Sequence, residues 1–236
     1  MKSLSVITIL TVLLLSACHK GSDGSTNNPN DKTHIQFVSA SPSEQNPDLY
    51  LLGSSAPQIA GFYYYLSTGY DQPRIDDLTV TIKDGTHGTV LTSPPLGCSK
   101  DSFYTWFLYD TFPNLKYFMT TDVMWPSVPA GKAAVKFVNL SPNAGPIMYR
   151  VQGQSALTPA LGYASTSPLT AASSFIQIDT GWHTIEVVDA NTNQVIDSLH
   201  AGQLKTDQGS YYTLWTTGYR GATGQNEIYT GWTQDH

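Results

Sequence analysis

The sequence is poor in charge, in glutamate and in long apolar runs. Charged residues make up 13% of its 236 residues and the net charge is −6. This composition argues against a nucleic-acid partner, because such partners require a basic face. Only 3 glutamates occur, and nothing singles out the facing carboxylate pair that a glycosidase needs. No apolar run reaches the roughly 20 residues that span a bilayer.

Signature motifs of catalysis and metal binding are also missing from the sequence. There is no Gly-x-Ser-x-Gly, His-Glu-x-x-His or Gly-Lys-Ser/Thr motif, and the 6 histidines have no metal-ligand spacing. Asp71, Asp76 and Asp77 cluster around Pro73, but their spacing does not match a calcium loop. We therefore predict no enzyme, no cofactor and no metal site, and we interpret these aspartates as solvated turn residues.

The N-terminus carries the clearest targeting signal. Lys2 precedes an apolar run, which ends in Leu15-Ser16-Ala17-Cys18. A charged start, a short apolar middle and small residues before a cleavage point are typical of a signal peptide, and the last four residues match a bacterial lipobox. We predict that residues 1–17 are removed and that Cys18 is lipidated, which anchors the protein to a membrane. The alternative is an ordinary signal peptide with a chance cysteine.

The residues that follow Cys18 indicate which membrane the protein is anchored to. His19 replaces the aspartate that, by resemblance to enterobacterial lipoproteins, would favour retention in the inner membrane, so we expect the outer membrane. From Lys20 to Lys32 the chain has no apolar side chain. Such a stretch cannot bury enough surface to offset its ordering entropy, so residues 18–33 are predicted to be a flexible tether. The body then faces either the periplasm or the cell surface.

Two stretches of the body, about 100 residues apart, resemble each other. Residues 35–42 match residues 135–142 at an offset of 100, and residues 80–84 and 102–106 match residues 185–189 and 210–214 at offsets of 105 and 108. The offset grows only across loop-like stretches, where insertions are tolerated. We predict two copies of one domain, at residues 34–126 and 133–236, joined in a segment rich in proline and glycine.

The pattern in each copy is typical of short β-strands. Ile35 and Phe37 should point one way and Gln36 the other, and Lys136 takes the place of Gln36 in the second copy, which predicts one wet face in each copy. The segment Phe103–Tyr109 is apolar or aromatic on both faces and should be central or covered. Short strands with frequent turn signals predict an all-β fold of two tandem Ig-like antiparallel β-sandwich domains.

Three motifs resemble a known family. They are Phe-Val-Asn-Leu-Ser-Pro-Asn at residues 137–143, a Gly-aromatic step at residues 162–163, and Asp-Thr-Gly-Trp-His-Thr-Ile-Glu-Val at residues 179–187. The chain resembles the bacterial domain-of-unknown-function family 4397, which occurs in exported proteins, often in tandem. The resemblance is best over residues 133–220, and the first copy departs from it at residues 74–78. It implies an Ig-like sandwich without catalytic residues, in a cell-envelope lipoprotein of the Bacteroidota type.

Aromatic side chains are the remaining signal for function. Tyr63, Tyr64, Tyr65 and Tyr70 lie in a loop region of the first copy. Consecutive aromatic residues in an extended chain cannot all point inward, and tyrosine is common at interfaces. These rings either bind a protein or a glycan, or they seal the junction between the two copies. Trp125, at the boundary, is expected to pack there.

Two further residues have an ordinary interpretation beside a functional one. Cys98 has no partner within the chain if Cys18 carries lipid, so it is either a lone thiol or an intermolecular link. His183 is in phase with Ile185 and Val187, and we interpret it as a packed structural histidine.

Three functions remain open at this stage. The first is a non-catalytic envelope lipoprotein that binds a protein partner or a glycan. The second is a structural accessory subunit or spacer of an outer-membrane complex. The third is a hydrolase whose site is assembled only by the fold, which would need a buried carboxylate–histidine pair in a cleft.

Overall fold

The chain is nearly all β in the computed structural model, which describes residues 31–43, 45–51, 54–74, 78–166, 174–199 and 203–235. Within these residues the helical element is η1, a 3-10 helix at Gly224–Asn226, and no helix is long and apolar enough to cross a membrane. The all-β prediction is confirmed. The predicted signal peptide, Cys18, residues 18–30 of the tether, Asp76 and Asp77 lie outside the described residues.

The first half of the chain, residues 31–122, forms two sheets. Its strands are β1 (His34–Ser39), β2 (Asp48–Leu51), β3 (Ser67–Asp71), β4 (Val80–Asp84), β5 (Gly88–Thr92), β6 (Phe103–Tyr109) and β7 (Lys116–Thr121). The inner sheet has the order β3-β1-β6-β7 and the outer sheet the order β2-β4-β5.

The second half, residues 132–235, contains three sheets. Its strands are β8 (Lys132–Asn139), β9 (Ile147–Val151), β10 (Ser165–Thr166), β11 (Ile176–Asp179), β12 (Gly181–His183), β13 (Ile185–Asp189), β14 (Val195–Ser198), β15 (Leu204–Thr206), β16 (Tyr211–Thr217) and β17 (Tyr229–Gln234). Its inner sheet has the order β10-β8-β16-β17, with β11 also paired to β8. The outer sheet is β14-β13-β9, and β12 pairs with β15.

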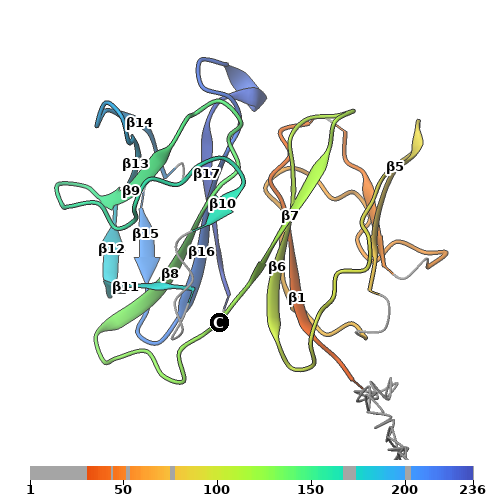
Figure 1. Ribbon diagram of the computed structural model, residues 1–236, viewed down its shortest axis with the longest axis horizontal. Coiled ribbons are helices and arrows are strands. Elements are labelled where there is room, and N and C mark those ends of the chain that lie inside the picture. The colour runs from red at the N-terminus through yellow and green to blue at the C-terminus, as the bar shows by residue number, and fades with distance from the viewer. Residues whose placement is uncertain are drawn as a thin grey trace, which may run out of the picture.

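Strands that match in sequence occupy matching places in the two halves. In each inner sheet the first strand of the half runs parallel to a later one, β1 beside β6 and β8 beside β16. The other neighbours in both halves are antiparallel. The parallel pairs place the starts of β1, β6, β8 and β16 at one end of the molecule (Figure 1).

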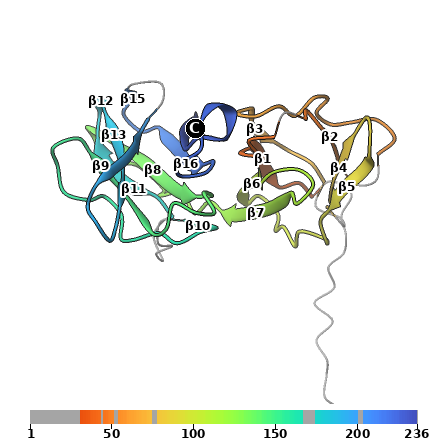
Figure 2. The ribbon, with the colours of Figure 1, turned by 90° about the horizontal axis from the view of Figure 1, so that it is seen from above.

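The sheets stack in four layers, with the two inner sheets face to face in the middle (Figure 2). One apolar core lies inside each half, between its inner and outer sheets. A third apolar cluster joins the halves across the two inner sheets; it consists of Val38, Ala40, Phe107, Tyr109, Val138, Leu140 and Trp215. The inner sheets are therefore covered on both faces.

This arrangement corrects the prediction of a wet face on the first strand of each copy. Gln36 and Lys136 are fully buried, each at 0% exposure. The alternation itself is as predicted, because Ile35 and Phe37 lie in the core of the first half. The second face is dry because the other half packs against it, which the pattern of one strand cannot reveal.

The prediction for Phe103–Tyr109 is confirmed. This segment is β6, which lies between β1 and β7 and is buried from Tyr104 to Tyr109. Trp106 points into the core of the first half, whereas Phe107 packs in the cluster between the halves. Its counterpart β16 is buried along its whole length.

Candidate functional site

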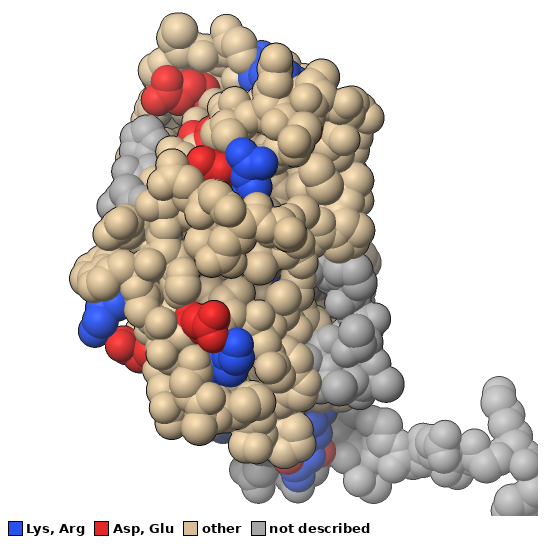
Figure 3. Space-filling model, turned by 90° about the vertical axis from the view of Figure 1, so that its left-hand side faces the viewer, with Lys and Arg blue, Asp and Glu red and all other residues tan. Residues whose placement is uncertain are grey.

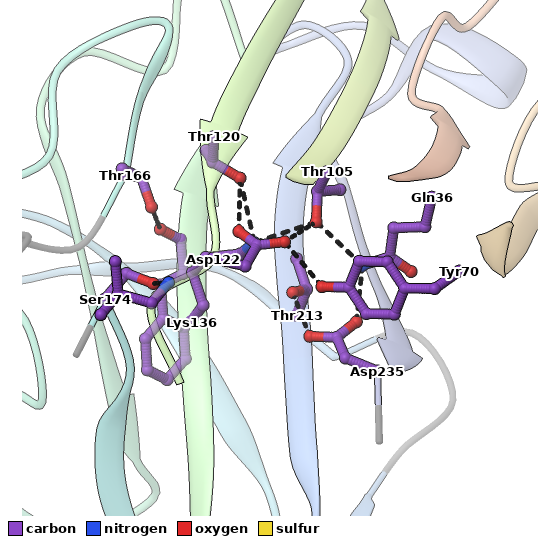
Figure 4. A network of polar contacts seen from close by, with 12 residues as sticks. Gln36, Tyr70, Thr105, Thr120, Asp122, Lys136, Thr166, Ser174, Thr213 and Asp235 are labelled. Atoms are coloured by element: carbon purple, nitrogen blue, oxygen red, sulfur yellow. Dashed lines mark hydrogen bonds and ion pairs between the residues drawn. The ribbon is translucent and has the colours of Figure 1, made fainter. Parts of the chain in front are cut away.

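Polar side chains from both halves meet in a buried network between the two inner sheets. We call it the interface network, and it consists of Gln36, Tyr70, Thr105, Thr120, Asp122, Lys136, Thr213 and Asp235 (Figure 4). The strands place these side chains there because β1, β6, β8 and β16 each present alternate residues to the other half.

Lys136 and Asp122 form the charged centre of this network. The Lys136 ammonium group donates to the Asp122 carboxylate and to the hydroxyls of Thr105 and Thr120, the latter two at 3.0 Å. Both charged side chains have 0% exposure. A buried ion pair is stable only when its remaining polar positions are also satisfied.

Asp122 meets that requirement with three hydroxyl donors. Thr105 and Tyr70 donate to its Oδ2 at 2.6 and 2.7 Å, and Thr120 donates to its Oδ1 at 2.9 Å. The pKa of Tyr70 is raised above its usual range, first by burial and then by the Asp122 carboxylate. The tyrosine therefore stays protonated and keeps its role as a donor.

Asp235 is the second buried carboxylate of the network. Gln36 Nε2 donates to its Oδ1 at 2.7 Å, and Thr213 donates to its Oδ2 at 2.6 Å. Burial raises the pKa of Asp235 to about 6, against the opposing effect of the Lys136 charge. This carboxyl group can therefore change its protonation state near neutral pH while it is inside the protein.

The two aspartates occupy matching positions in the two halves. The backbone N–H of Asp122 donates to Phe103 O, and that of Asp235 donates to Tyr211 O, both at 2.8 Å. Each aspartate accepts a hydrogen bond from the threonine at the third position of the neighbouring strand, Thr105 or Thr213. Each half thus contributes one aspartate to a side chain of the other half.

The predicted tyrosine cluster divides between the surface and the interface. Tyr63 is 53% exposed and Tyr65 is 39% exposed, whereas Tyr64 is buried. The rings of Tyr64 and Tyr65 have centroids 3.5 Å apart, and the Tyr65 ring lies 3.9 Å from that of Tyr229 in the second half. We call Tyr64, Tyr65 and Tyr229 the tyrosine seam. Tyr70, the fourth predicted residue, belongs to the interface network.

Other residues singled out in the sequence have structural contacts. Trp125 packs with Met124 and Val128 against a cluster of the second half, as predicted. His183 Nε2 lies 2.7 Å from Asp179 O. Cys98 is half-buried at the edge of the first core, and burial raises the pKa of its thiol to about 11. A further aromatic residue, Trp232 of β17, is 37% exposed, with its ring 5.9 Å from that of Tyr212.

The closest approach to a catalytic arrangement is the pair of Asp84 and His87. His87 Nδ1 lies 2.9 Å from Asp84 Oδ2 in the turn between β4 and β5, and the histidine side chain is 49% exposed. The nearby serines have other partners, because Ser41 Oγ donates to Asp110 O and Ser43 Oγ accepts from the Phe112 N–H. The pair is thus a turn contact at the surface. Among the described residues, no three His, Cys, Asp or Glu side chains are grouped to hold a metal ion.

Four members of the interface network could not be identified as site residues from the sequence. Gln36 and Lys136 have the alternation of surface residues, and Asp122 and Asp235 follow strands in positions typical of turn residues. The sequence does contain one indication of this site. Thr105, Thr120 and Thr213 lie on the same strand faces, and small hydroxyl side chains can satisfy the polar groups of a buried interface. The network is largely internal: Gln36, Thr105, Lys136 and Thr213 are fully buried, Tyr70 is partly buried at its edge, and the groups join the two halves.

Comparison with known families matches residues 33–150 to DUF4397, a domain of unknown function. The chain belongs to this family. The match covers every strand of the first half, all of β8, and β9 as far as Arg150. It therefore extends over the stretch at residues 74–78 where the first copy departs from the expected motif. No curated protein matches the chain.

Proposed function

We propose that this DUF4397 protein is a membrane-anchored, non-catalytic lipoprotein of the cell envelope, built from two copies of one domain, that binds a protein partner or a glycan. The lipobox ending at Cys18 and the polar stretch behind it support the anchor. The several acyl chains of a mature bacterial lipoprotein anchor firmly, whereas one chain binds only marginally. The matching strand orders of the two halves support the duplication.

One observation carries the binding role. The two halves are joined through buried groups, yet aromatic rings at their junction remain open to solvent, with Tyr63 at 53% and Tyr65 at 39% exposure. A junction that served only to join the halves would not need the Tyr63 ring, since more than half of that residue is open to solvent. Tyrosine combines a large apolar face with a polar tip, and such side chains dominate protein contacts.

A crosslinking pull-down from intact native cells tests this function. The full-length lipoprotein and the variant Tyr63→Ala with Tyr65→Ala are crosslinked in the cells, purified and analysed by mass spectrometry. We expect a partner that is recovered with the wild type and lost with the double variant. Trp182→Ala is the matched control, because Trp182 is 64% exposed but lies on β12, away from the tyrosine seam. Equal recovery with all three proteins would reject the assignment of the site.

A structural role is the second candidate, and the interface network favours it. A buried ion pair with all its hydroxyl partners fixes the two halves in one orientation, as a spacer requires. Under this alternative the protein co-purifies with one envelope complex in constant stoichiometry. The crosslinks then fall outside residues 63–65, and the tyrosine variants leave the recovery unchanged.

A further inference from the structure

A groove of about 390 Å³ lies at the open edge of the second half. It runs between β14, the edge strand of the outer sheet, and the segment that leads into β17, the edge strand of the inner sheet. Ile196 and Ile228 form its floor, and both are partly buried against the core of this half. Asp197, Arg220 and Glu227 bring charge to its sides.

The groove carries excess negative charge. Arg220 donates from Nη1 to Asp189 Oδ2 at 2.5 Å, so its positive charge is compensated by a carboxylate that does not line the groove. Asp197 and Glu227 are the two acidic groups on the lining, so together with Asp189 the groove and its border hold three carboxylates and one guanidinium group, in a chain with a net charge of −6. Elsewhere on this side of the molecule charges are few, and acidic and basic groups lie next to each other (Figure 3).

The Asp197 carboxylate is held in place by a chain of buried hydroxyl groups. Thr230 Oγ1 donates to Asp197 Oδ2 at 2.7 Å, and it lies 3.0 Å from Thr216 Oγ1. The hydroxyl of Tyr149, which is fully buried, lies 2.7 Å from the same Thr216 oxygen. A carboxylate fixed in this way loses little freedom on binding, which favours affinity.

The groove also borders the tyrosine seam. Tyr229 directly follows Ile228 of the floor, and its ring lies 3.9 Å from that of Tyr65. Tyr229 itself is not part of the lining, so the tyrosine seam adjoins the groove without adding a ring to it.

We propose that this groove binds a lysine or arginine side chain on an extended segment of a partner protein. The inference rests on the proposed binding function and names the class of its ligand. Lysine and arginine have an apolar stem and a cationic head, which match the isoleucine floor and the two carboxylates. Anionic ligands are disfavoured by those carboxylates. Among the described residues β14 pairs with β13 alone, and an extended partner segment would add to its other edge.

Fluorescence anisotropy with a labelled peptide tests the proposal. The purified full-length protein, in a neutral detergent, is titrated against an octapeptide of alternating lysine and threonine, with alternating glutamate and threonine as the second probe. We expect binding of the lysine peptide only. The variant Asp197→Asn with Glu227→Gln should weaken it by about tenfold or more, because both charged contacts are lost.

The control variant removes two charges elsewhere. Asp179→Asn with Asp207→Asn neutralises two exposed aspartates at the end of the molecule where β8 and β16 begin, and it should change the affinity by less than about twofold, since surface charges that far away are screened by salt. Equal weakening by both variants would mean non-specific attraction and would overturn the proposal. If Asp197→Asn disturbs folding, Glu227→Gln alone is used, because Glu227 is exposed.

The result is separable from that of the cell pull-down. A partner lost with the tyrosine variants, together with no binding of the lysine peptide, rejects the groove and keeps the proposed function. Peptide binding that depends on Asp197 and Glu227, together with equal recovery of the cellular partner by the wild type and the tyrosine variant, supports the groove and rejects the tyrosine residues as the binding site. A neutral glycan that binds to the protein and is lost with Glu227→Gln overturns the assignment to a basic segment.

Discussion

Gln36 and Lys136 occupy the same place in the first strand of their halves, 100 residues apart, and each reaches an aspartate of the opposite half. Gln36 contacts Asp235, and Lys136 contacts Asp122. The two contacts differ in charge, because only one of them is an ion pair. The interface network therefore contains two carboxylates and one ammonium group, all of them buried between the halves.

Removal of the buried ammonium group should be severe. Lys136→Met keeps the approximate size of the side chain but leaves Asp122 buried without its counter-ion, which costs about 3–5 kcal/mol. We expect the free energy of unfolding in urea to fall by this amount. Lys132→Met is the matched control: it breaks an exposed pair with Asp179 and should cost less than about 1 kcal/mol. If Lys136→Met and Lys132→Met lowered the free energy of unfolding by similar small amounts, the buried ion pair would contribute no more stability than the exposed one.

The pH dependence of stability should reveal Asp235. Its pKa in the folded protein, about 6, lies above its usual value of 3.8, so the folded state favours the protonated form. The stability from this group is complete below pH 4 and is lost as the pH rises through about 6, by about 3 kcal/mol at most.

Asp235→Asn should abolish this loss while it keeps both neighbours, because an amide can accept from Gln36 and donate to Thr213. The measurement compares urea unfolding of wild type and variant between about pH 4 and pH 8. We expect the variant to gain stability relative to wild type as the pH rises. A constant difference over that range would contradict the assignment. Asp207→Asn, at an exposed pair with Lys205, should show no such trend.

The contact between Tyr65 and Tyr229 should be energetically coupled. A double-mutant cycle with alanine at both positions isolates their interaction, which we expect at about 0.5–1.5 kcal/mol for a pair of aromatic rings in contact. Tyr63→Ala should change stability by less than about 0.5 kcal/mol, because that side chain is exposed. Additive losses at Tyr65 and Tyr229 would show that the rings are neighbours without mutual stabilisation.

A side chain at Gly231, which lies against the Trp215 ring, should destabilise the protein. A Cβ atom on Gly231 would lie 2.8 and 2.9 Å from two atoms of the Trp215 ring. Trp215 is 1% exposed and packs between the halves, so its ring has little room to move. Gly231→Ala should cost about 1–3 kcal/mol through overpacking. Thermal unfolding checks this, with Gly162→Ala as the control, since a Cβ there meets nothing within 4 Å.

The strands and their core-facing residues could be predicted from the sequence, because alternation of apolar and polar residues is a property of a single strand. Alternation at Ile35 and Phe37 predicts a core face, and apolar residues on both faces of Phe103–Tyr109 predict a covered strand. The same rules do not predict what covers Phe103–Tyr109, because that depends on how the two halves are oriented. Gln36 and Lys136 look like surface residues for this reason.

The candidate sites were predictable to a lesser degree. The aromatic run at residues 62–65 indicates an interface, and the structure places Tyr64 and Tyr65 beside Tyr229, a residue 164 positions away from Tyr65 in the sequence. The groove at Asp197 and Glu227 left no local pattern, because its lining comes from three separate segments. Sites of this kind arise from tertiary contacts between residues that are ordinary in their own strands.

The hydrogen bond between Gln36 and Asp235 joins residues 199 positions apart. A chain is synthesised, and emerges from any export channel, with its N-terminus first. The Gln36 amide can donate to Thr105 within the first half, but its bond to the second half forms only after residue 235 has been made. Until then the inner sheet of the first half exposes Phe107, Tyr109 and Val38 to solvent. We expect the nascent protein to need protection from aggregation until the second half has been made.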